Sequence, residues 1–333
     1  MFEENGHILE EGWEKNATYL LGIPLHPQGE LNSLDFIMQA QGDLEEMRLR
    51  RHNLITQTVL NVLLGYIFLY NTVVSMKIVI RRRRILAGWC CLLQAISGLA
   101  FVACSIGADL PNGPSCRQVL WTAGFGMAFS PICVGVTLLQ KAYLVHNRSK
   151  WLLTAGIVLL APQPLITYYA WKSPALMVNT GGCLVIYPSE LPWIKLALDA
   201  PINITFSVAF ILVVYRQYRL FGSAAWARLV RDGIRTMCLI VFSNLICMLC
   251  IVFEAAGLFS EAFFLIDWVV TSALLTHHLS ARRSTQNLPH RPRTSHVLHG
   301  SLQAAAAPSE SLNKSVSEDS QLVRYAHVQV SIG

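Results

Sequence analysis

Seven long apolar stretches constrain this chain more than any other feature of its sequence. They are Leu54–Ile80, Ile85–Ala108, Gln118–Tyr143, Trp151–Ala170, Ile194–Tyr215, Thr236–Leu258 and Ala262–Leu279. A helix of about 20 apolar residues crosses the hydrocarbon core of a bilayer. Backbone polar groups there must be paired within the segment, and a helix pairs them. Hydrophobic residues make up 53% of the chain and charged residues only 14%. We therefore expect an all-α membrane protein, a seven-transmembrane-helix bundle.

The distribution of basic residues between the loops predicts the orientation of the bundle. Nineteen of the 26 Lys and Arg residues lie on one side, in the loops after the first, third and fifth stretches and in the C-terminal region. Lys and Arg concentrate on the cytosolic side of membrane proteins, so we expect the N-terminus outside and the C-terminus in the cytosol. The three Arg residues at 48–51 nearly balance Arg81–Arg84 across the first stretch, and the later loops determine the assignment.

The regions that flank the apolar body complete a three-part organisation. Residues 1–53 hold ten acidic and four basic residues and are expected to form an extracellular acidic tail, with Asn16 in the glycosylation sequon Asn16-Ala17-Thr18. Residues 54–279 form the transmembrane domain. Residues 280–333 have few large apolar side chains and are expected to be a disordered cytosolic tail.

Charge and composition also narrow the functional classes. The net charge of +6 lies mostly at the predicted cytosolic face, where it suits the anionic inner leaflet of a bilayer rather than nucleic acid. We expect the plasma membrane as the location, with an endomembrane as the alternative. The sequence has no phosphate-binding Gly-rich loop and no nucleophile near a base, so we expect neither an enzyme nor a cofactor or metal site.

Two of the nine cysteines fall in predicted outer loops, whereas the other seven lie within the apolar stretches. Cys116 is at the outer end of the third stretch, and Cys183 is in the loop between the fourth and fifth. Because the exterior is oxidising, we predict a Cys116–Cys183 disulfide. Cys104, near the outer end of the second stretch, is the rival partner.

Carboxylates within the apolar stretches predict a ligand site, because charged groups at membrane depth are costly and usually face the bundle interior or water. Three of them are expected about 6–8 Å below the outer surface at 1.5 Å per residue. The candidate ligand-binding residues are Asp199, Asn203, Glu254, Asp267 and Trp268. They favour a cationic or hydrogen-bond-donating ligand. Alternatively, the carboxylates are hydrated residues at the mouth of the bundle, and Lys195, one turn away, neutralises Asp199.

The third inner loop, Arg216–Arg235, is rich in Arg and carries aromatic residues. It predicts extensions of the fifth and sixth helices that dock a cytosolic partner. The candidate partner-binding residues are Arg216, Arg219, Trp226, Arg228, Arg231 and Arg235. The alternative is that this charge serves only to orient the chain.

Together, the outward N-terminus, the seven helices and the pairing of Cys116 with Cys183 resemble the G-protein-coupled receptor superfamily. The resemblance is architectural and covers Leu54–Leu279. The segment Trp226–Gly233 looks like that of orphan seven-helix proteins common in fungi. The third helix ends Gln140-Lys141-Ala142-Tyr143, without an Asp-Arg-Tyr type triplet, and the seventh has no Asn-Pro-x-x-Tyr pattern.

The resemblance implies a receptor that transmits binding of an extracellular small molecule or peptide to a heterotrimeric G protein. Two alternatives remain open. The first is a cation- or proton-coupled transporter or channel, which predicts polar residues through the whole depth of the membrane. The second is a scaffold that does not signal. A retinal protein is excluded, because Ala262–Leu279 contains no Lys for a Schiff base.

Overall fold

The computed structural model describes residues 17–286, apart from 21, 82, 84, 146–148, 179–181, 189, 222–223, 258–259 and 261. The chain divides into two compact units, Met1–Ala281 and Arg282–Gly333. The predicted disordered tail beyond residue 286 and the sequon residue Asn16 lie outside the described residues.

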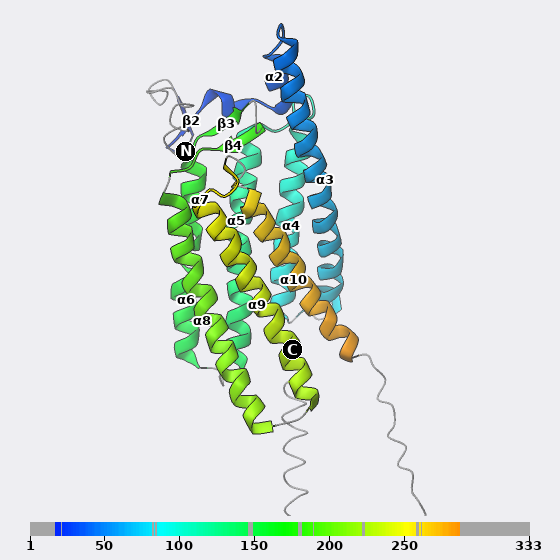
Figure 1. Cartoon of the computed structure of the whole chain (residues 1–333), viewed down its shortest axis with the longest axis vertical. Coiled ribbons are helices and arrows are strands. Elements are labelled where there is room, and N and C mark those ends of the chain that lie inside the picture. Colours follow the sequence, from blue (N-terminus) through cyan, green and yellow to red (C-terminus); the bar gives the residue numbers. More distant parts are fainter. Residues whose placement is uncertain are drawn as a thin grey trace, which may run out of the picture. The chain divides into compact units, whose positions relative to one another are not determined.

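Long helices packed side by side make up the body of this unit (Figure 1). They are α3 (Leu44–Arg81), α4 (Leu86–Gly107), α5 (Cys116–Val145), α6 (Lys150–Leu160), α7 (Gln163–Lys172), α8 (Glu190–Phe221), α9 (Ala224–Val252) and α10 (Ala262–Gln286). Within the described residues, six helices are long and apolar enough to cross a membrane, with α6 and α7 counted as one. The chain is therefore a helical protein suited to embedding in a membrane. The 32-residue α8 is not among the six.

The helix boundaries differ from the predicted stretches where backbone geometry overrides hydropathy. The fourth stretch, predicted as one helix, breaks between α6 and α7 at Ala161 and Pro162, because proline has no N–H to continue the hydrogen-bond ladder. The sixth ends at Val252 instead of Leu258. In contrast, Pro131 and Pro201 lie within the continuous helices α5 and α8. The first long helix, α3, begins at Leu44 and not at Leu54 as predicted, and its added residues are mostly polar.

Small residues allow the helices to approach one another closely. A Cβ atom at Gly98 of α4 would lie 2.4 Å from the ring of Phe68 on α3, and one at Gly126 of α5 would lie 2.0 Å from the indole of Trp268 on α10. Trp268 is 1% exposed and its ring lies 5.1 Å from that of Phe68, centroid to centroid. The packing of α4 against α3 and of α5 against α10 therefore depends on glycines opposite aromatic rings.

A cover of short elements closes one end of the bundle (Figure 1). We call this set the cover: the hairpins β1 (Thr18–Leu20) with β2 (Ile23–Leu25) and β3 (Ala175–Val178) with β4 (Gly182–Val185), the 3-10 helix η2 (Pro27–Glu30) and the helix α2 (Ser33–Met38). The loop predicted between the fourth and fifth helices thus contains an antiparallel hairpin. Sequence alone did not indicate it, because its strands are only four residues long.

The cover is fastened to the first turn of α5. The predicted disulfide is present: Cys116 is bonded to Cys183, with Cα atoms 5.5 Å apart, whereas the rival Cys104 is a free thiol. Next to it, Arg117 Nη1 lies 2.7 Å from the Glu30 carboxylate, and Arg117 Nη2 donates to the His26 carbonyl at 3.1 Å. The hairpin β3–β4 and the N-terminal segment are therefore both tied to the same helix end.

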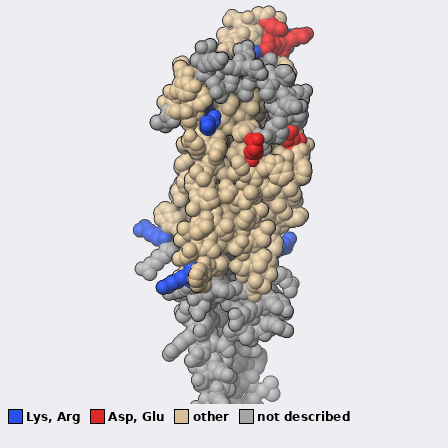
Figure 2. Space-filling model, turned by 90° about the vertical axis from the view of Figure 1, so that its left-hand side faces the viewer, with Lys and Arg blue, Asp and Glu red and all other residues tan. Residues whose placement is uncertain are grey.

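Charged side chains avoid the middle of the visible helix surface. Figure 2 shows a broad band of uncharged residues, with acidic and some basic side chains towards the cover end and Lys and Arg side chains towards the opposite end. The exposed residues in the helices include many large apolar side chains, such as Tyr66, Leu212, Phe242 and Val158. Such a band suits contact with lipid rather than water.

Candidate functional site

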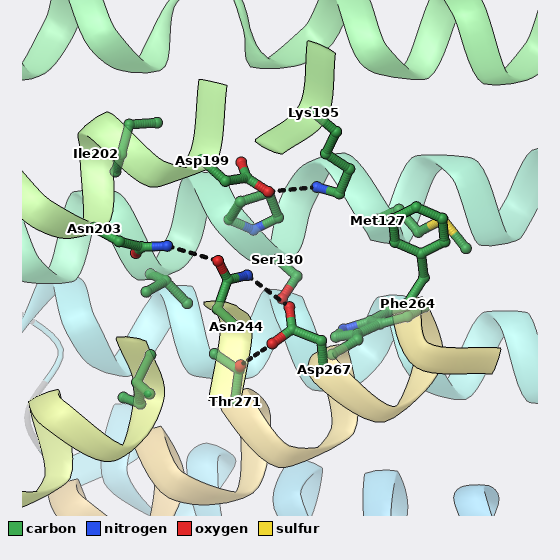
Figure 3. Close-up of a pocket in the computed structure, with 14 residues that line it drawn as sticks. Met127, Ser130, Lys195, Asp199, Ile202, Asn203, Asn244, Phe264, Asp267 and Thr271 are labelled. Carbon is green, nitrogen blue, oxygen red and sulfur yellow. Dashed lines mark hydrogen bonds and ion pairs between the residues drawn. The ribbon is translucent and has the colours of Figure 1, made fainter. Parts of the chain in front are cut away.

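A pocket lies inside the bundle where α5, α8, α9 and α10 meet (Figure 3). We call it the polar chamber, and its space unfilled by protein atoms measures about 510 Å³, including space open to the outside. It is lined by Met127, Ser130, Pro131, Val134, Lys195, Asp199, Ile202, Asn203, Ile240, Asn244, Phe264, Asp267, Trp268 and Thr271. The chamber brings carboxylates, amides and an ammonium group together on a background of aliphatic and aromatic side chains, as small-molecule sites do.

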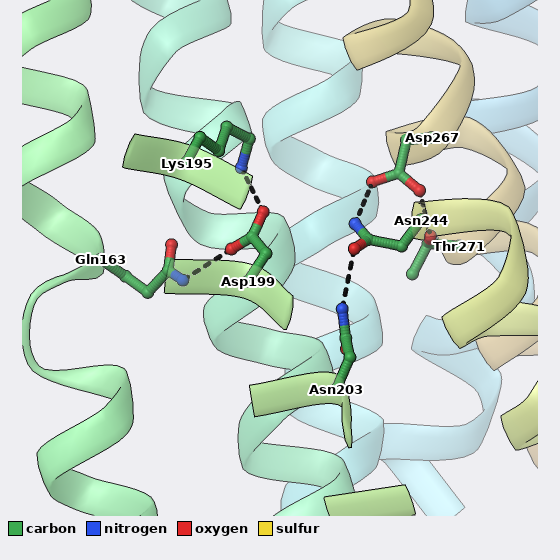
Figure 4. A network of polar contacts seen from close by, with 7 residues as sticks. All are labelled: Gln163, Lys195, Asp199, Asn203, Asn244, Asp267 and Thr271. Atoms are coloured by element: carbon green, nitrogen blue, oxygen red, sulfur yellow. Dashed lines mark hydrogen bonds and ion pairs between the residues drawn. The ribbon is translucent and has the colours of Figure 1, made fainter. Parts of the chain in front are cut away.

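The first polar network in the chamber is a buried ion pair. Lys195 and Asp199 are one turn apart on α8, and Lys195 Nζ lies 2.8 Å from Asp199 Oδ2. Their side chains are only 8% and 2% exposed. Gln163 Nε2 donates to the other carboxylate oxygen at 2.7 Å (Figure 4). Asp199 therefore has a cationic partner on its own helix and an amide partner from α7.

The break between α6 and α7 positions Gln163. Pro162 caps the start of α7, and Gln163 is the first residue of that helix. Its side chain is fully buried and points to α8 (Figure 4). Because α7 begins at Gln163, this side chain is directed towards α8. There the carboxylate of Asp199 accepts a hydrogen bond from its amide N–H.

The second network links three helices through amides. Asn203 Nδ2 on α8 donates to Asn244 Oδ1 on α9 at 2.7 Å, and Asn244 Nδ2 donates to Asp267 Oδ2 on α10 at 2.9 Å (Figure 4). Thr271 Oγ1, one turn further along α10, lies 3.5 Å from Asp267 Oδ1. Among the described residues, no Lys or Arg forms an ion pair with Asp267. The two carboxylates of the chamber therefore differ: only Asp199 is paired with a cation.

Trp268 contributes an unpaired donor to the chamber. Its indole packs against Phe68 and Phe101. Trp268 also lines the chamber, next to Asp267 in the sequence. Its Nε1–H is buried and has no hydrogen-bond partner within the described part of the chain. A buried N–H without a partner is costly, so a ligand with an acceptor atom would gain from binding next to it.

The structure brings together four of the five predicted ligand-binding residues. Asp199, Asn203, Asp267 and Trp268 all line the chamber, but whether they bind a ligand stays a prediction. Glu254 is the exception and the prediction of its place was wrong. It lies beyond the end of α9 with φ at 48°, in a turn that also contains Gly257 at φ 59°, and it does not line the chamber.

Among the other chamber residues, one contact could be predicted from the sequence and the rest could not. The neutralisation of Asp199 by Lys195 is confirmed, and the four-residue spacing on one helix gave that signal. The sequence marks Gln163 only as the second residue of a Pro162-Gln163 pair. Thr271 was not singled out, since a threonine in an apolar helix is common. Asn244 is a polar residue within the apolar stretch Thr236–Leu258, but no spacing in the sequence indicates its partners, which come from other helices.

The predicted partner-binding residues lie on α8 and α9, whose helices continue through most of the predicted inner loop. The side chains of Arg216, Arg219, Trp226, Arg228 and Arg231 are outside the described residues. Arg235 is described and exposed. Partner binding by this region therefore stays a prediction.

Smaller polar contacts continue from the chamber towards α3 and α4. Gln94 donates to Ser130 at 2.6 Å, and Asn71 donates to Ser272 at 3.1 Å. Within the described residues, no group of three or more His, Cys, Asp or Glu side chains is arranged to hold a metal ion. The polar contacts are thus hydrogen bonds between helices, which contribute about 0.6–2 kcal/mol each in membrane proteins.

No protein-family model matches the chain. No curated protein matches it either. Function must therefore be argued from the polar chamber and its surroundings.

Proposed function

We propose that this protein is a seven-helix, receptor-like membrane protein that binds a ligand in the polar chamber and signals to a cytosolic partner of the heterotrimeric G-protein type. In this proposal α8 also crosses the membrane and is the fifth of seven spans along the chain. The cover lies outside the cell, the C-terminus lies in the cytosol, and the membrane is the plasma membrane. The distribution of Lys and Arg supports this orientation.

Polar side chains from three helices converge at one place inside the bundle, and this convergence is the main support for the proposal. The network from Asn203 through Asn244 to Asp267 joins α8, α9 and α10. A ligand that replaces one of these hydrogen bonds favours one arrangement of the three helices over another, and differential binding is what shifts a conformational equilibrium. Because α8 and α9 are continuous far beyond the chamber, a change in their packing reaches the opposite end of the bundle.

The test uses the full chain in lipid nanodiscs with purified heterotrimeric G proteins. Tissue and culture extracts serve as ligand sources, and guanine-nucleotide exchange is the readout. We expect at least one extract to accelerate exchange on one heterotrimer. An Arg235→Glu variant should reduce the acceleration, because it reverses an exposed charge near the cytosolic end of α9. Arg81→Glu, an exposed residue at the end of α3, is the matched control. Exchange that is unaffected by every extract would argue against the proposal.

A second candidate, cation or proton transport, is favoured by the buried polar residues of α10. Thr271, Ser272, Thr276 and His278 are all at most 5% exposed. With Asp267 they extend over eleven residue steps, about 16 Å of helix at 1.5 Å per residue. Proton or cation flux into liposomes that is lost in Asp267→Asn, without nucleotide exchange, would support this candidate instead.

A further inference from the structure

A second cavity adjoins the polar chamber on the side of the cover. We call it the apolar chamber, and its unfilled space measures about 610 Å³, including space open to the outside. Its walls are mostly aliphatic, from α5, α7, α8 and the end of the β3–β4 hairpin, and include Leu120, Ala123, Ile166, Ala170 and Leu191. Apolar walls of this kind bind hydrocarbon.

The two chambers share part of their walls. Met127, Lys195 and Phe264 line both, and Figure 3 shows these three side chains together at one edge of the polar chamber. Lys195 Nζ also lies 5.9 Å from the centroid of the Phe264 ring. A single molecule that passes these side chains would therefore have one end among polar groups and the other among aliphatic groups.

The charges in the polar chamber indicate which charge the polar end of a ligand should carry. Lys195 is already paired with Asp199, which leaves Asp267 as the carboxylate without a cationic partner in the described part of the chain. An ionised carboxylate accepts about four hydrogen bonds, and Asp267 receives two, from Asn244 and Thr271. Two acceptor positions remain, and a protonated amine is the group that satisfies both charge and hydrogen bonding.

The unpaired N–H of Trp268 adds a second requirement. It is a buried donor in the wall of the polar chamber, so an oxygen next to the amine would be a matched acceptor. In the apolar chamber, the Thr167 hydroxyl is likewise buried without a partner among the described residues. These groups tolerate oxygen substituents on the ligand, but the amine and the hydrocarbon are its main features.

We infer that the ligand is an amphiphilic amine, with its ammonium group at Asp267 in the polar chamber and its hydrocarbon chain in the apolar chamber. This inference rests on the proposed function, because it takes the polar chamber as the ligand site. It adds the chemical class of the ligand and a second part of the site that the sequence did not indicate.

The experiment measures saturable binding to the full chain in nanodiscs of neutral lipid, with radiolabelled n-octylamine as the probe. Empty nanodiscs give the amount dissolved in lipid. We expect n-octylamine to bind at least tenfold more tightly than ethylamine, which lacks the chain, and than octanoate or octanol, which lack the positive charge. Equal affinity of octanol and octylamine, or octylamine binding equal to that of empty nanodiscs, would overturn the inference without requiring any variant.

Variants then assign each end of the ligand to its chamber. Asp267→Asn should weaken octylamine binding at least tenfold, whereas Asp35→Asn, at an exposed position of α2, should not change it. Ala170→Leu fills part of the apolar chamber and should weaken octylamine binding at least tenfold while leaving ethylamine unchanged. Ala197→Leu makes the same change at an exposed position of α8 and should change neither. An Ala170→Leu variant that binds octylamine like the native chain would overturn the placement of the hydrocarbon.

The readout separates this inference from the proposed function, because binding needs no cytosolic partner. Saturable octylamine binding with the expected response to Ala170→Leu, but without nucleotide exchange in any assay, would support the amphiphilic amine and overturn receptor signalling. Nucleotide exchange driven only by ligands without an amine would support signalling and overturn the amphiphilic amine.

Discussion

Individual side chains give the polar chamber its character, and the two carboxylates illustrate how. Asp199 is held by Lys195 on its own helix, and that pairing was predictable because the residues are four apart. Asp267 is held by Asn244 from a different helix. No spacing in the sequence indicates that contact, since it depends on how α9 and α10 pack. Residue identity predicted which groups are costly to bury, but the fold determined their partners.

The buried ion pair predicts strong coupling between two substitutions. Lys195→Met or Asp199→Asn alone should destabilise the protein by about 3–5 kcal/mol, because each leaves one charge buried without its partner. The double variant should be less destabilised than the sum of the two. Thermal unfolding in detergent, arranged as a double-mutant cycle, measures the coupling. Additive effects of the two substitutions would show that the pair makes no net contribution.

Asn244 predicts a second, separate effect at the residue scale. Asn244→Ala removes the bridge between Asn203 and Asp267 and leaves both without that partner. We expect a loss of about 1–3 kcal/mol of stability and weaker ligand binding. Thr205→Ala, which removes a polar group at an exposed position of α8, should cost much less in the same unfolding assay. An equal loss in both variants would contradict a specific role for the bridge.

At the scale of elements, hydropathy predicted where helices lie more reliably than where they end. The predicted stretch for α10 begins at the observed residue, Ala262, but runs only to Leu279. The stretch predicted as the fourth helix is broken at Pro162, and α9 ends before Glu254. Both departures come from backbone geometry, which hydropathy does not contain: a missing N–H in one case and a positive φ in the other. The break matters for the site, because it positions Gln163.

Because α3 and α4 pack closely at Gly98, we expect no larger side chain to be accommodated there. Gly98→Ala places a Cβ 2.4 Å from the Phe68 ring, so the helices must separate, and we expect a loss of about 1–3 kcal/mol. Gly88→Ala on the same helix meets its neighbours at 3.4 Å, an ordinary contact. It should be neutral or slightly stabilising, since alanine favours helix more than glycine does. Unfolding midpoints of the two variants in one detergent give the comparison, and equal midpoints would count against close packing at Gly98.

For the whole molecule, the sequence predicted a helical body suited to a membrane and one disulfide. The described residues include six helices long and apolar enough to cross a membrane, and the disulfide is present. The seven-span arrangement and its orientation stay predictions. The apolar chamber and the cover could not be predicted. The residues of the apolar chamber are ordinary aliphatic ones from five separate segments, and the cover consists of strands too short to give a periodic pattern.

We expect loss of the disulfide to destabilise the cover, whereas loss of a free thiol should not. Cys116→Ser with Cys183→Ser should lower stability by about 2–4 kcal/mol and should increase the rate at which protease cleaves the β3–β4 hairpin, which the bond ties to α5. Cys104→Ser, the rival thiol, and Cys238→Ser, an exposed free thiol, should do neither. Limited proteolysis with and without reducing agent checks the result, and a native cleavage rate in the double variant would show that the bond does not hold the cover.

Two consecutive residues at the tip of α5 hold the cover, one by a covalent bond and one by an ion pair. Cys116 carries the hairpin and Arg117 carries the N-terminal segment. Consecutive side chains on a helix are about 100° apart around its axis, so rotation of α5 pulls the two attachments in different directions at the same moment. Because α5 also lines both chambers, a rotation of this helix would reshape the two chambers and shift both attachments of the cover together.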